Sequence, residues 1–199
     1  HGLRIQSLDV GAGSIAAAVV AGPQGTSERI GGDAFLLALG SYSTLLARPL
    51  GLSLPIYPVK GYSVTLPLAE NSDAPQVSIT DESRRIVCSR LGNRLRIAGT
   101  AELAGYDTSI DPVRCAAILR RARQLFPQVQ SVGEAAYWAG LRPATPSNIP
   151  VIGRSRIGKL FFNTGHGTLG WTLACGSGRA IADIIGGKIP PMDFPFSDL

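Results

Sequence analysis

The sequence contains no apolar run long enough to cross a bilayer as a helix. No stretch approaches the ~18 uncharged apolar residues that a membrane-spanning helix requires, although 45% of the 199 residues are hydrophobic. It also lacks the charged start and apolar run of a signal peptide, and it begins with His rather than Met. We therefore expect a soluble globular protein whose natural start lies elsewhere.

Cysteine is scarce, and the spacing of the cysteines argues against small domains that are held together by disulfides or zinc. Cys88, Cys115 and Cys175 are odd in number, far apart and free of any C-x-x-C pair. This pattern argues against a disulfide framework and a zinc site, so no metal is expected. It favours a reducing compartment, in which Cys88 and Cys175 would be small buried apolar residues.

Acidic residues are fewer than basic ones, 14 against 19, which gives a net charge of +5. Several arginines fall within one predicted helix, namely Arg114, Arg120, Arg121 and Arg123. Such a helix could contact acidic lipid or nucleic acid, but a solvated face is the most frequent outcome. We expect no nucleic-acid partner.

The first 40 residues predict short strands at 3–8, 15–20 and 34–39, separated by glycine-rich turns. Within them, 11–16 matches the dinucleotide pattern G-x-G-x-x-A. A true fingerprint follows a buried strand and opens a helix of several turns, whereas here the preceding strand is polar and Gly22-Pro23 interrupts the next segment. We predict a hairpin turn instead.

Two unbroken apolar strands, 34–39 and 160–162, predict a parallel sheet buried on both faces. The first ends at Gly40, after which Ser41 or Ser43 would cap a short helix before Pro49. The second leads into a glycine turn and a helix that ends at Gly186-Gly187. The free amides of that helix suit an electron-rich ligand atom, although an ordinary βα turn would give the same pattern.

Residues 55–136 differ in character and predict an antiparallel sheet with one helix. Asp111-Pro112 provides an N-cap and a proline at the first helical position. An apolar face follows and ends at Pro127; its members are Val113, Ala117, Ile118, Ala122, Leu125 and Phe126. The fold class is therefore α/β with an α+β insert.

Three segments, 138–146, 150–154 and 163–178, closely resemble the C-terminal part of the small subunit of bacterial FAD-dependent D-amino acid dehydrogenase. That family is grouped with D-amino acid oxidase, glycine oxidase and sarcosine oxidase. Segments 38–43, 57–62 and 96–102 also resemble family segments, in the right order. The long glycine-rich match after Asn163 makes the resemblance specific.

The resemblance implies an incomplete, Rossmann-like FAD-binding layer, formed by 1–54 and 137–199, and a mixed or antiparallel-sheet substrate domain at 55–136. The family's opening βαβ unit, with its G-x-G-x-x-G turn for the FAD pyrophosphate, has no counterpart here. We therefore expect a C-terminal fragment that binds FAD poorly alone, is inactive alone and self-associates through open sheet edges.

The resemblance also implies which residues contact FAD. Negative charge on the reduced flavin would be stabilised by the helix start near residues 168–172. His166 lies between two glycines and is expected to contribute backbone contacts rather than act as a general base. The candidate cofactor residues are Gly40, Ser41, Gly165, His166, Gly167, Thr168, Leu169, Gly170, Trp171 and Thr172.

For the substrate, Arg142 matches the family arginine that pairs with the amino acid carboxylate, and Tyr62 could donate its hydroxyl to the same group. An inter-domain salt bridge for Arg142 and a core position for Tyr62 remain open. Two departures stand out: Ser147-Asn148 replaces a common Asp-Gly, and Arg84-Arg85 stands where an aromatic residue often precedes the next strand. The second leaves the substrate side chain undetermined.

The function that the resemblance implies is oxidation of D-amino acids to 2-oxo acids and ammonia by hydride transfer to FAD. The resemblance further implies a quinone or respiratory-chain electron acceptor. It also implies a cytoplasmic protein that is peripheral to the inner face of the bacterial inner membrane. Two alternatives stay open. One is a glycine- or sarcosine-type oxidase that reduces oxygen, and the other is a non-enzymatic binding module whose contact surface is the basic helix after Asp111.

Overall fold

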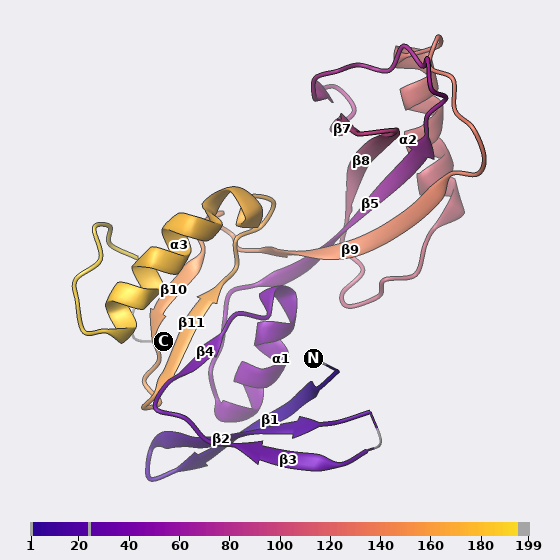
Figure 1. Cartoon of the computed structure of the whole chain (residues 1–199). Coiled ribbons are helices and arrows are strands. Elements are labelled where there is room, and N and C mark those ends of the chain that lie inside the picture. The colour runs from indigo at the N-terminus through magenta and orange to yellow at the C-terminus, as the bar shows by residue number, and fades with distance from the viewer. Residues whose placement is uncertain (1, 24, 195–199) are drawn as a thin grey trace. The chain divides into compact units, whose positions relative to one another are not determined.

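The computed structural model describes residues 2–23 and 25–194, and the chain divides into two compact units (Figure 1). Unit 1 consists of His1–Tyr57 and Pro143–Leu199, and unit 2 of Pro58–Arg142. Among the described residues, no helix is both long and apolar enough to cross a membrane. That each unit serves a different ligand stays a prediction.

A three-stranded antiparallel sheet opens unit 1. It consists of β1 (Arg4–Gly11), β2 (Ser14–Ala21) and β3 (Ser27–Ile30). Ala12 and Gly13 join β1 to β2 and both have positive φ, 49° and 75°, as a two-residue type I′ hairpin turn requires. The predicted hairpin is therefore confirmed at the position of the dinucleotide-like pattern. The sequence analysis missed β3, whose four residues are all exposed.

The second sheet of unit 1 has the order β10-β11-β4, with bounds Val151–Arg154, Leu160–Thr164 and Phe35–Leu37. β11 and β4 run parallel, as predicted. Leu160 and Phe162 belong to the core that the hairpin and the short helices share, whereas Phe161 packs with residues of the last helix. Both faces of β11 are thus covered, which explains its unbroken apolar sequence.

The chain after β4 turns through η1 (Gly40–Tyr42), α1 (Ser43–Ala47) and η2 (Arg48–Leu50). The predicted serine cap is wrong. Tyr42 is the N-cap of α1 and makes no side-chain cap bond, while the Ser43 hydroxyl accepts from the Leu39 amide at 3.1 Å. The 3₁₀ turn before α1 brings Ser43 back toward the strand end rather than toward the amides of the helix.

Helix α3 (Gly170–Ile185) ends unit 1's regular structure, and Gly187 follows it with φ 75°. Its buried residues are Ser177, Ala180 and Ile181, which form one helical stripe. Cys175 lies outside that stripe and is exposed, so the prediction that it is buried is wrong; Cys88 is buried as expected.

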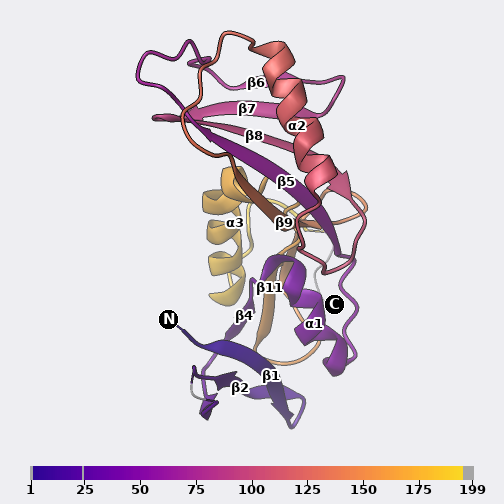
Figure 2. The same cartoon turned by 90° about the vertical axis from the view of Figure 1, so that its right-hand side faces the viewer.

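Unit 2 is built on a five-stranded sheet in the order β6-β7-β8-β5-β9. The strand bounds are β5 (Tyr57–Pro67), β6 (Ile79–Asp81), β7 (Ile86–Leu91), β8 (Arg94–Glu102) and β9 (Ala136–Ala144). The pairs β5–β8, β6–β7 and β7–β8 are antiparallel, which confirms the predicted sheet. Helix α2 (Pro112–Leu125) lies along one face of it (Figure 2).

Helix α2 begins as the sequence predicts. The Asp111 carboxylate accepts from the amides of Val113 and Arg114, and Pro112 follows the cap. The buried residues are Cys115, Ile118 and Ala122. Val113 is 73% exposed and Ala117 is also exposed, so their predicted places on the apolar face are wrong. Val113 precedes Ile118, and Ala117 precedes Ala122, by five residues, which places both outside the stripe of residues three and four apart.

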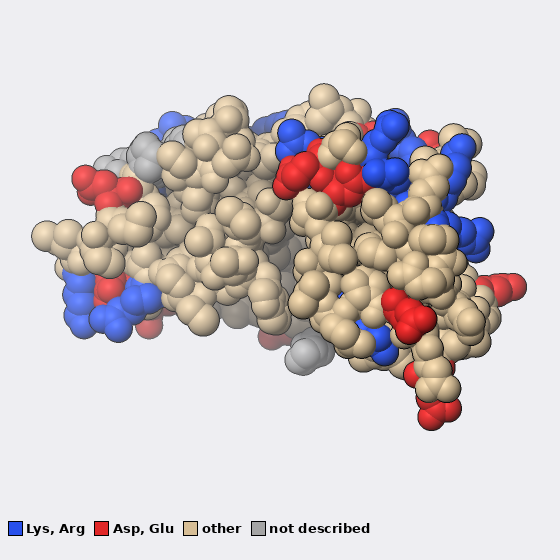
Figure 3. All heavy atoms as spheres, turned by 90° about the horizontal axis from the view of Figure 1, so that it is seen from above, with Lys and Arg blue, Asp and Glu red and all other residues tan. Residues whose placement is uncertain are grey.

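The arginines of α2 are partly paired with acidic residues. Arg121 donates to Asp81 at 2.6 Å, which ties the helix to β6. Arg114 lies 3.5 Å from Glu102 and from Asp111. Figure 3 likewise shows basic and acidic side chains next to each other on the visible face. The helix is therefore not a uniformly basic surface.

The tether at Asp81 predicts an acid-sensitive contribution to stability. Hydrogen bonds from Ser83 and then from Arg121 lower the pKa of Asp81 to about 2. Since an unfolded aspartate titrates near ~3.9, the ionised form stabilises the fold above that pH, and the contribution is lost as the pH falls toward 2. Asp81→Asn should therefore lower the free energy of unfolding at pH 6 but not at pH 2.

Urea unfolding followed by circular dichroism across this pH range measures the effect. At each pH the free energy of unfolding of the variant is compared with that of the parent chain. The difference at pH 6 is the reference for the difference at pH 2. An equal difference at both values would show that the ionised form of Asp81 has no special role.

Candidate functional site

The first group of candidate residues lies at the carboxyl ends of β4 and β11 in unit 1. The Thr164 hydroxyl donates to the Gly40 carbonyl at 3.0 Å, and the Ser43 hydroxyl lies 3.1 Å from the same Thr164 oxygen. Since Ser43 also accepts from the Leu39 amide, a chain of hydrogen bonds joins the two strand ends. It brings Gly40 and Ser41 to the turn that starts at residue 165. Thr164, which links the two strand ends, was missed by the sequence analysis.

The turn after β11 depends on glycine at two positions. Gly165 has φ 78°, and a Cβ there would lie 2.9 Å from the Thr145 methyl group. Gly167 has φ 55°, and its amide donates to the Pro143 carbonyl at 2.9 Å. Residues with a side chain rarely adopt a positive φ, so the backbone needs glycine at both positions, and at Gly165 the packing needs it too.

The start of α3 leaves backbone donors available. Leu169 is the N-cap and makes no side-chain cap bond, so the first amides of the helix have no partner from a capping side chain. Trp171, in the first turn, is 95% exposed. These amides lie at the positive end of the helix dipole, where an electron-rich atom is stabilised.

Two buried polar atoms near this turn also lack partners in the part of the chain that the structure describes. They are Nε2 of His166 and Oδ1 of Asn163. Burial lowers the pKa of His166, so the neutral imidazole is favoured. A buried polar group without a partner is costly, and a flavin, which carries both donors and acceptors, fits these atoms and the helix amides.

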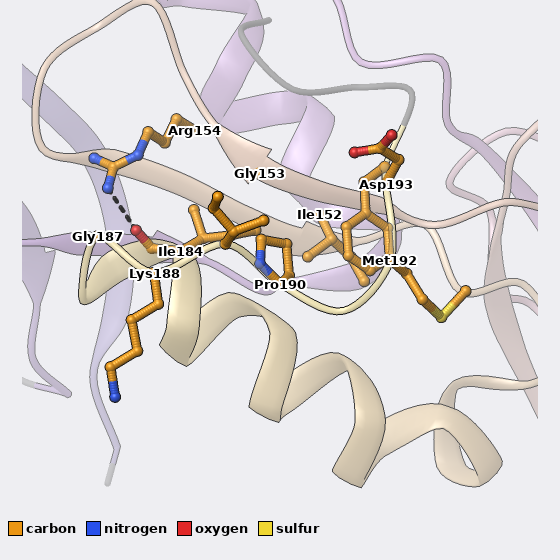
Figure 4. A pocket seen from close by; sticks show the side chains of 11 residues that line it. Ile152, Gly153, Arg154, Ile184, Gly187, Lys188, Pro190, Met192 and Asp193 are labelled. Carbon is orange, nitrogen blue, oxygen red and sulfur yellow. Dashed lines mark hydrogen bonds between the residues drawn. The ribbon is translucent and has the colours of Figure 1, made fainter.

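A separate hollow of about 280 Å³ lies at the other end of α3 (Figure 4). Ile152, Arg154 and Met192 are among its lining residues, and Arg154 donates to the Ile184 carbonyl at the helix end. None of the candidate cofactor residues lines this hollow.

Arg142 belongs to unit 2, where its guanidinium lies against the bare backbone of Gly61. A Cβ at Gly61 would overlap the guanidinium carbon and both terminal nitrogens. Nη1 of Arg142 donates to the Thr100 carbonyl at 2.8 Å. Thr100 has φ 67°, which is rare for a β-branched residue, and the β5–β8 pairing is irregular between Lys60 and Tyr62. The local distortion thus places a carbonyl at the guanidinium.

The Arg142 charge has no carboxylate partner among the ion pairs of unit 2. The side chain is half-buried, and this burial lowers the pKa of the guanidinium. A desolvated cation is normally paired with an anion. An anionic ligand would therefore offset the free-energy cost of burying the Arg142 charge.

Tyr62 is placed differently. It is 1% exposed within the core of unit 2, and its hydroxyl donates to Glu102 at 2.6 Å. Burial, followed by the hydrogen bond to Glu102, raises the pKa of Tyr62. A phenol has a single proton to donate, so binding a substrate carboxylate would require its release from Glu102. The predicted substrate contact of Tyr62 stays a prediction.

Sequence analysis missed a buried charged group beside Tyr62, which we name the Lys60 cluster: Lys60, Tyr62, Glu102 and Asp107. Lys60 is 2% exposed and donates to Asp107 at 2.9 Å, with Glu102 at 3.8 Å. Burial alone would lower the pKa of Lys60, but Asp107 and Tyr62 outweigh it and raise that pKa. A lysine within an otherwise buried strand was the available signal.

The chain matches the family described as FAD dependent oxidoreductase over residues 4–184. It is 55% identical over 196 residues to a D-amino acid dehydrogenase of Dechloromonas aromatica, covering 98% of this chain and 47% of that protein. A D-amino acid dehydrogenase of Xanthobacter autotrophicus is 46% identical over 193 residues, which cover 97% of this chain and 45% of that protein. The chain thus spans about half the length of these curated relatives.

Solved structures agree on the fold. Glycine oxidase from Geobacillus kaustophilus is similar with a TM-score of 0.79 at 26% identity, over 99% of this chain and 52% of that one. Glycine oxidase from Bacillus cereus gives a TM-score of 0.78 at 24% identity, over 98% and 52%. The predicted fold class is confirmed, as is FAD as the cofactor of the family. With most of its length inside one family match, this chain belongs to the FAD dependent oxidoreductases.

Proposed function

We propose that the polypeptide containing this chain is a D-amino acid dehydrogenase that oxidises D-amino acids to 2-oxo acids and ammonia. Bound FAD would supply the acceptor for the hydride that leaves the substrate Cα. The resulting imino acid would then be hydrolysed. The observation that carries the proposal is the half-buried Arg142 guanidinium, which has no carboxylate partner within unit 2.

Arg142 is suited to a carboxylate because its charge and its remaining N–H groups form a planar fork. Nη1 is bound to the Thr100 carbonyl, which fixes the plane of the guanidinium. A substrate carboxylate would accept two parallel hydrogen bonds from such a fork, and it would neutralise the buried charge. The fixed plane would hold the substrate carboxylate in one orientation within unit 2.

The turn and helix of unit 1 would contact the cofactor. The unpaired amides at the start of α3 would stabilise negative charge on the reduced flavin, as a helix N-terminus does for an oxyanion. His166 stays neutral under burial, and its free Nε2 suits a hydrogen bond rather than proton abstraction. The substrate amine would lose its proton before binding and needs no further base.

We also propose a quinone or respiratory-chain acceptor at the inner face of the bacterial inner membrane, in a cytoplasmic, reducing setting. The dehydrogenase names of the curated relatives support this. The glycine oxidase fold neighbours support an oxidase instead. Comparing turnover with oxygen against turnover with a quinone or dye tests the choice: faster turnover with oxygen would overturn the dehydrogenase proposal.

The proposed function predicts the effect of replacing Arg142 in the complete flavoprotein. Arg142→Ala should leave the flavin content near normal and cost about 3 kcal/mol in kcat/KM, as expected for loss of a charge-assisted bidentate contact. Arg142→Lys should recover only part of the loss, because an ammonium keeps the charge without the fork. Steady-state kinetics with a D-amino acid and a dye acceptor measure both.

The corresponding amino acid amide is the control for this prediction. It lacks the carboxylate, so it should be a poor substrate for the parent enzyme and scarcely worse for Arg142→Ala. If the alanine variant keeps its kcat/KM but unfolds at lower temperature, Arg142 is a structural residue and the substrate site lies elsewhere.

Another prediction follows from the contact between Gly61 and Arg142. Gly61→Ala places a methyl group where the guanidinium lies, so the side chain must move and its bond to Thr100 must break. The displaced atoms are the far end of a flexible side chain, so the substitution should cost little stability. We expect a raised KM with little change in the midpoint of unfolding, measured by kinetics and thermal unfolding.

Gly31→Ala is the matched control, because a Cβ at Gly31 meets nothing within 4 Å and its φ is not in the left-handed region. It should change neither quantity. Unchanged KM in Gly61→Ala would mean that the position of the guanidinium over Gly61 does not matter for the substrate.

A further inference from the structure

A second side chain on β9 occupies the space above a glycine, as Arg142 does. A Cβ at Gly140 would overlap the benzene part of the Trp138 indole. We propose that Trp138 forms a wall that selects substrates by their side chain, favouring D-amino acids with an extended apolar chain. This inference rests on the proposed function, because it takes Arg142 as the site of the substrate carboxylate.

Trp138, Gly140 and Arg142 lie on the same face of the sheet. Side chains alternate along a strand, so residues two apart share a face. Tyr137 lines a hollow together with α2 residues, and Ala139 packs against the core beneath α2. The even-numbered residues of β9 therefore lie on the opposite face, which α2 does not cover.

The indole extends along β9 toward Arg142. Gly140 is the residue between Trp138 and Arg142 on this face, and the benzene ring fills the space above it. At roughly 3.3 Å per residue, Gly140 lies about 7 Å along the strand from Arg142. A substrate held by its carboxylate at Arg142 would therefore meet the indole only if its side chain extends by several carbon atoms.

Arg96 supports the indole. Its guanidinium carbon lies 5.6 Å from the centroid of the Trp138 ring, within the range of a cation–π contact. Arg96 comes from β8, which is separated from β9 by β5, so the contact spans three strands. Trp138 nevertheless remains 56% exposed, which leaves apolar surface for a ligand.

The charges on this face narrow the substrate class. Arg142 and Arg96 are both cationic, so a substrate with a basic side chain would be repelled. Arg84 lines a hollow with α2 residues and thus lies on the covered side of the sheet. Among apolar substrates, we expect D-alanine to be too short to reach the indole, and D-leucine, D-methionine and D-phenylalanine to reach it.

The test compares the oxidation of D-leucine and of D-alanine. The enzyme is the full natural polypeptide that contains this chain, with FAD bound. Trp138→Ala should lower kcat/KM for D-leucine by about 10-fold to 100-fold, the range for lost apolar contacts in a pocket, and for D-alanine by less than about threefold. Gly140→Ala, which displaces the indole without removing it, should produce the same selective loss.

Tyr137→Ala is the matched control, since it removes an aromatic side chain of similar exposure, 44%, from the other face of the same strand. It should not change the ratio of the two substrates. Binding gives a second readout: 4-methylpentanoate and propanoate, which carry the two side chains without an amine, can be titrated by their effect on the flavin spectrum. Only 4-methylpentanoate should bind more weakly to Trp138→Ala.

Equal losses for both substrates in Trp138→Ala would overturn the inference. So would a preference for D-glutamate that Arg96→Ala abolishes, because the selecting group would then be Arg96. Failure of the proposed function is distinguishable: Arg142→Ala would leave kcat/KM unchanged for both D-leucine and D-alanine.

Discussion

Unit 2 contains a half-buried cation, Arg142, that donates to a backbone carbonyl but has no carboxylate partner within the unit. The Arg142 guanidinium has its place because Gly61 has no side chain, and its plane is set by the Thr100 carbonyl. That carbonyl faces Arg142 because Thr100 adopts φ 67° beside the irregular β5–β8 pairing. Backbone strain of this kind costs of order 1–3 kcal/mol and persists only where the surrounding structure imposes it.

The Lys60 cluster lies beside this distortion, since Lys60 pairs with Glu102, two residues after Thr100. Lys60 is buried, but two carboxylates balance its charge, and Glu102 also accepts the Tyr62 hydroxyl. Buried charges are tolerated when they are paired and hydrogen-bonded. The contrast with Arg142 is informative: on the α2 side Lys60 is paired internally, whereas on the other face Arg142 has no carboxylate partner within unit 2 and is proposed to bind the substrate.

The sequence predicts those features that depend on local chemistry. Asp111-Pro112 starts α2, and the glycines after Thr164 turn the chain into α3. It does not predict features that depend on distant partners. Nothing local distinguishes Gly61 from a turn glycine, because its reason is a side chain 81 positions later. The exposure of Cys175 and Val113 was missed similarly, since the buried stripe of a helix is set by its neighbours.

The two units use the absence of a side chain for different purposes. At Gly165 and Gly167 it permits a left-handed backbone, so the chain turns sharply into a helix whose N-cap residue makes no side-chain cap bond. At Gly61 and Gly140 the φ angles are ordinary, and the missing Cβ makes room for another side chain. We propose that the first use presents backbone donors to the flavin, whereas the second makes room for a guanidinium and an indole. Backbone dipoles suit a cofactor whose charge changes during the reaction, while a fixed cation and an apolar ring suit a substrate recognised by its carboxylate and side chain.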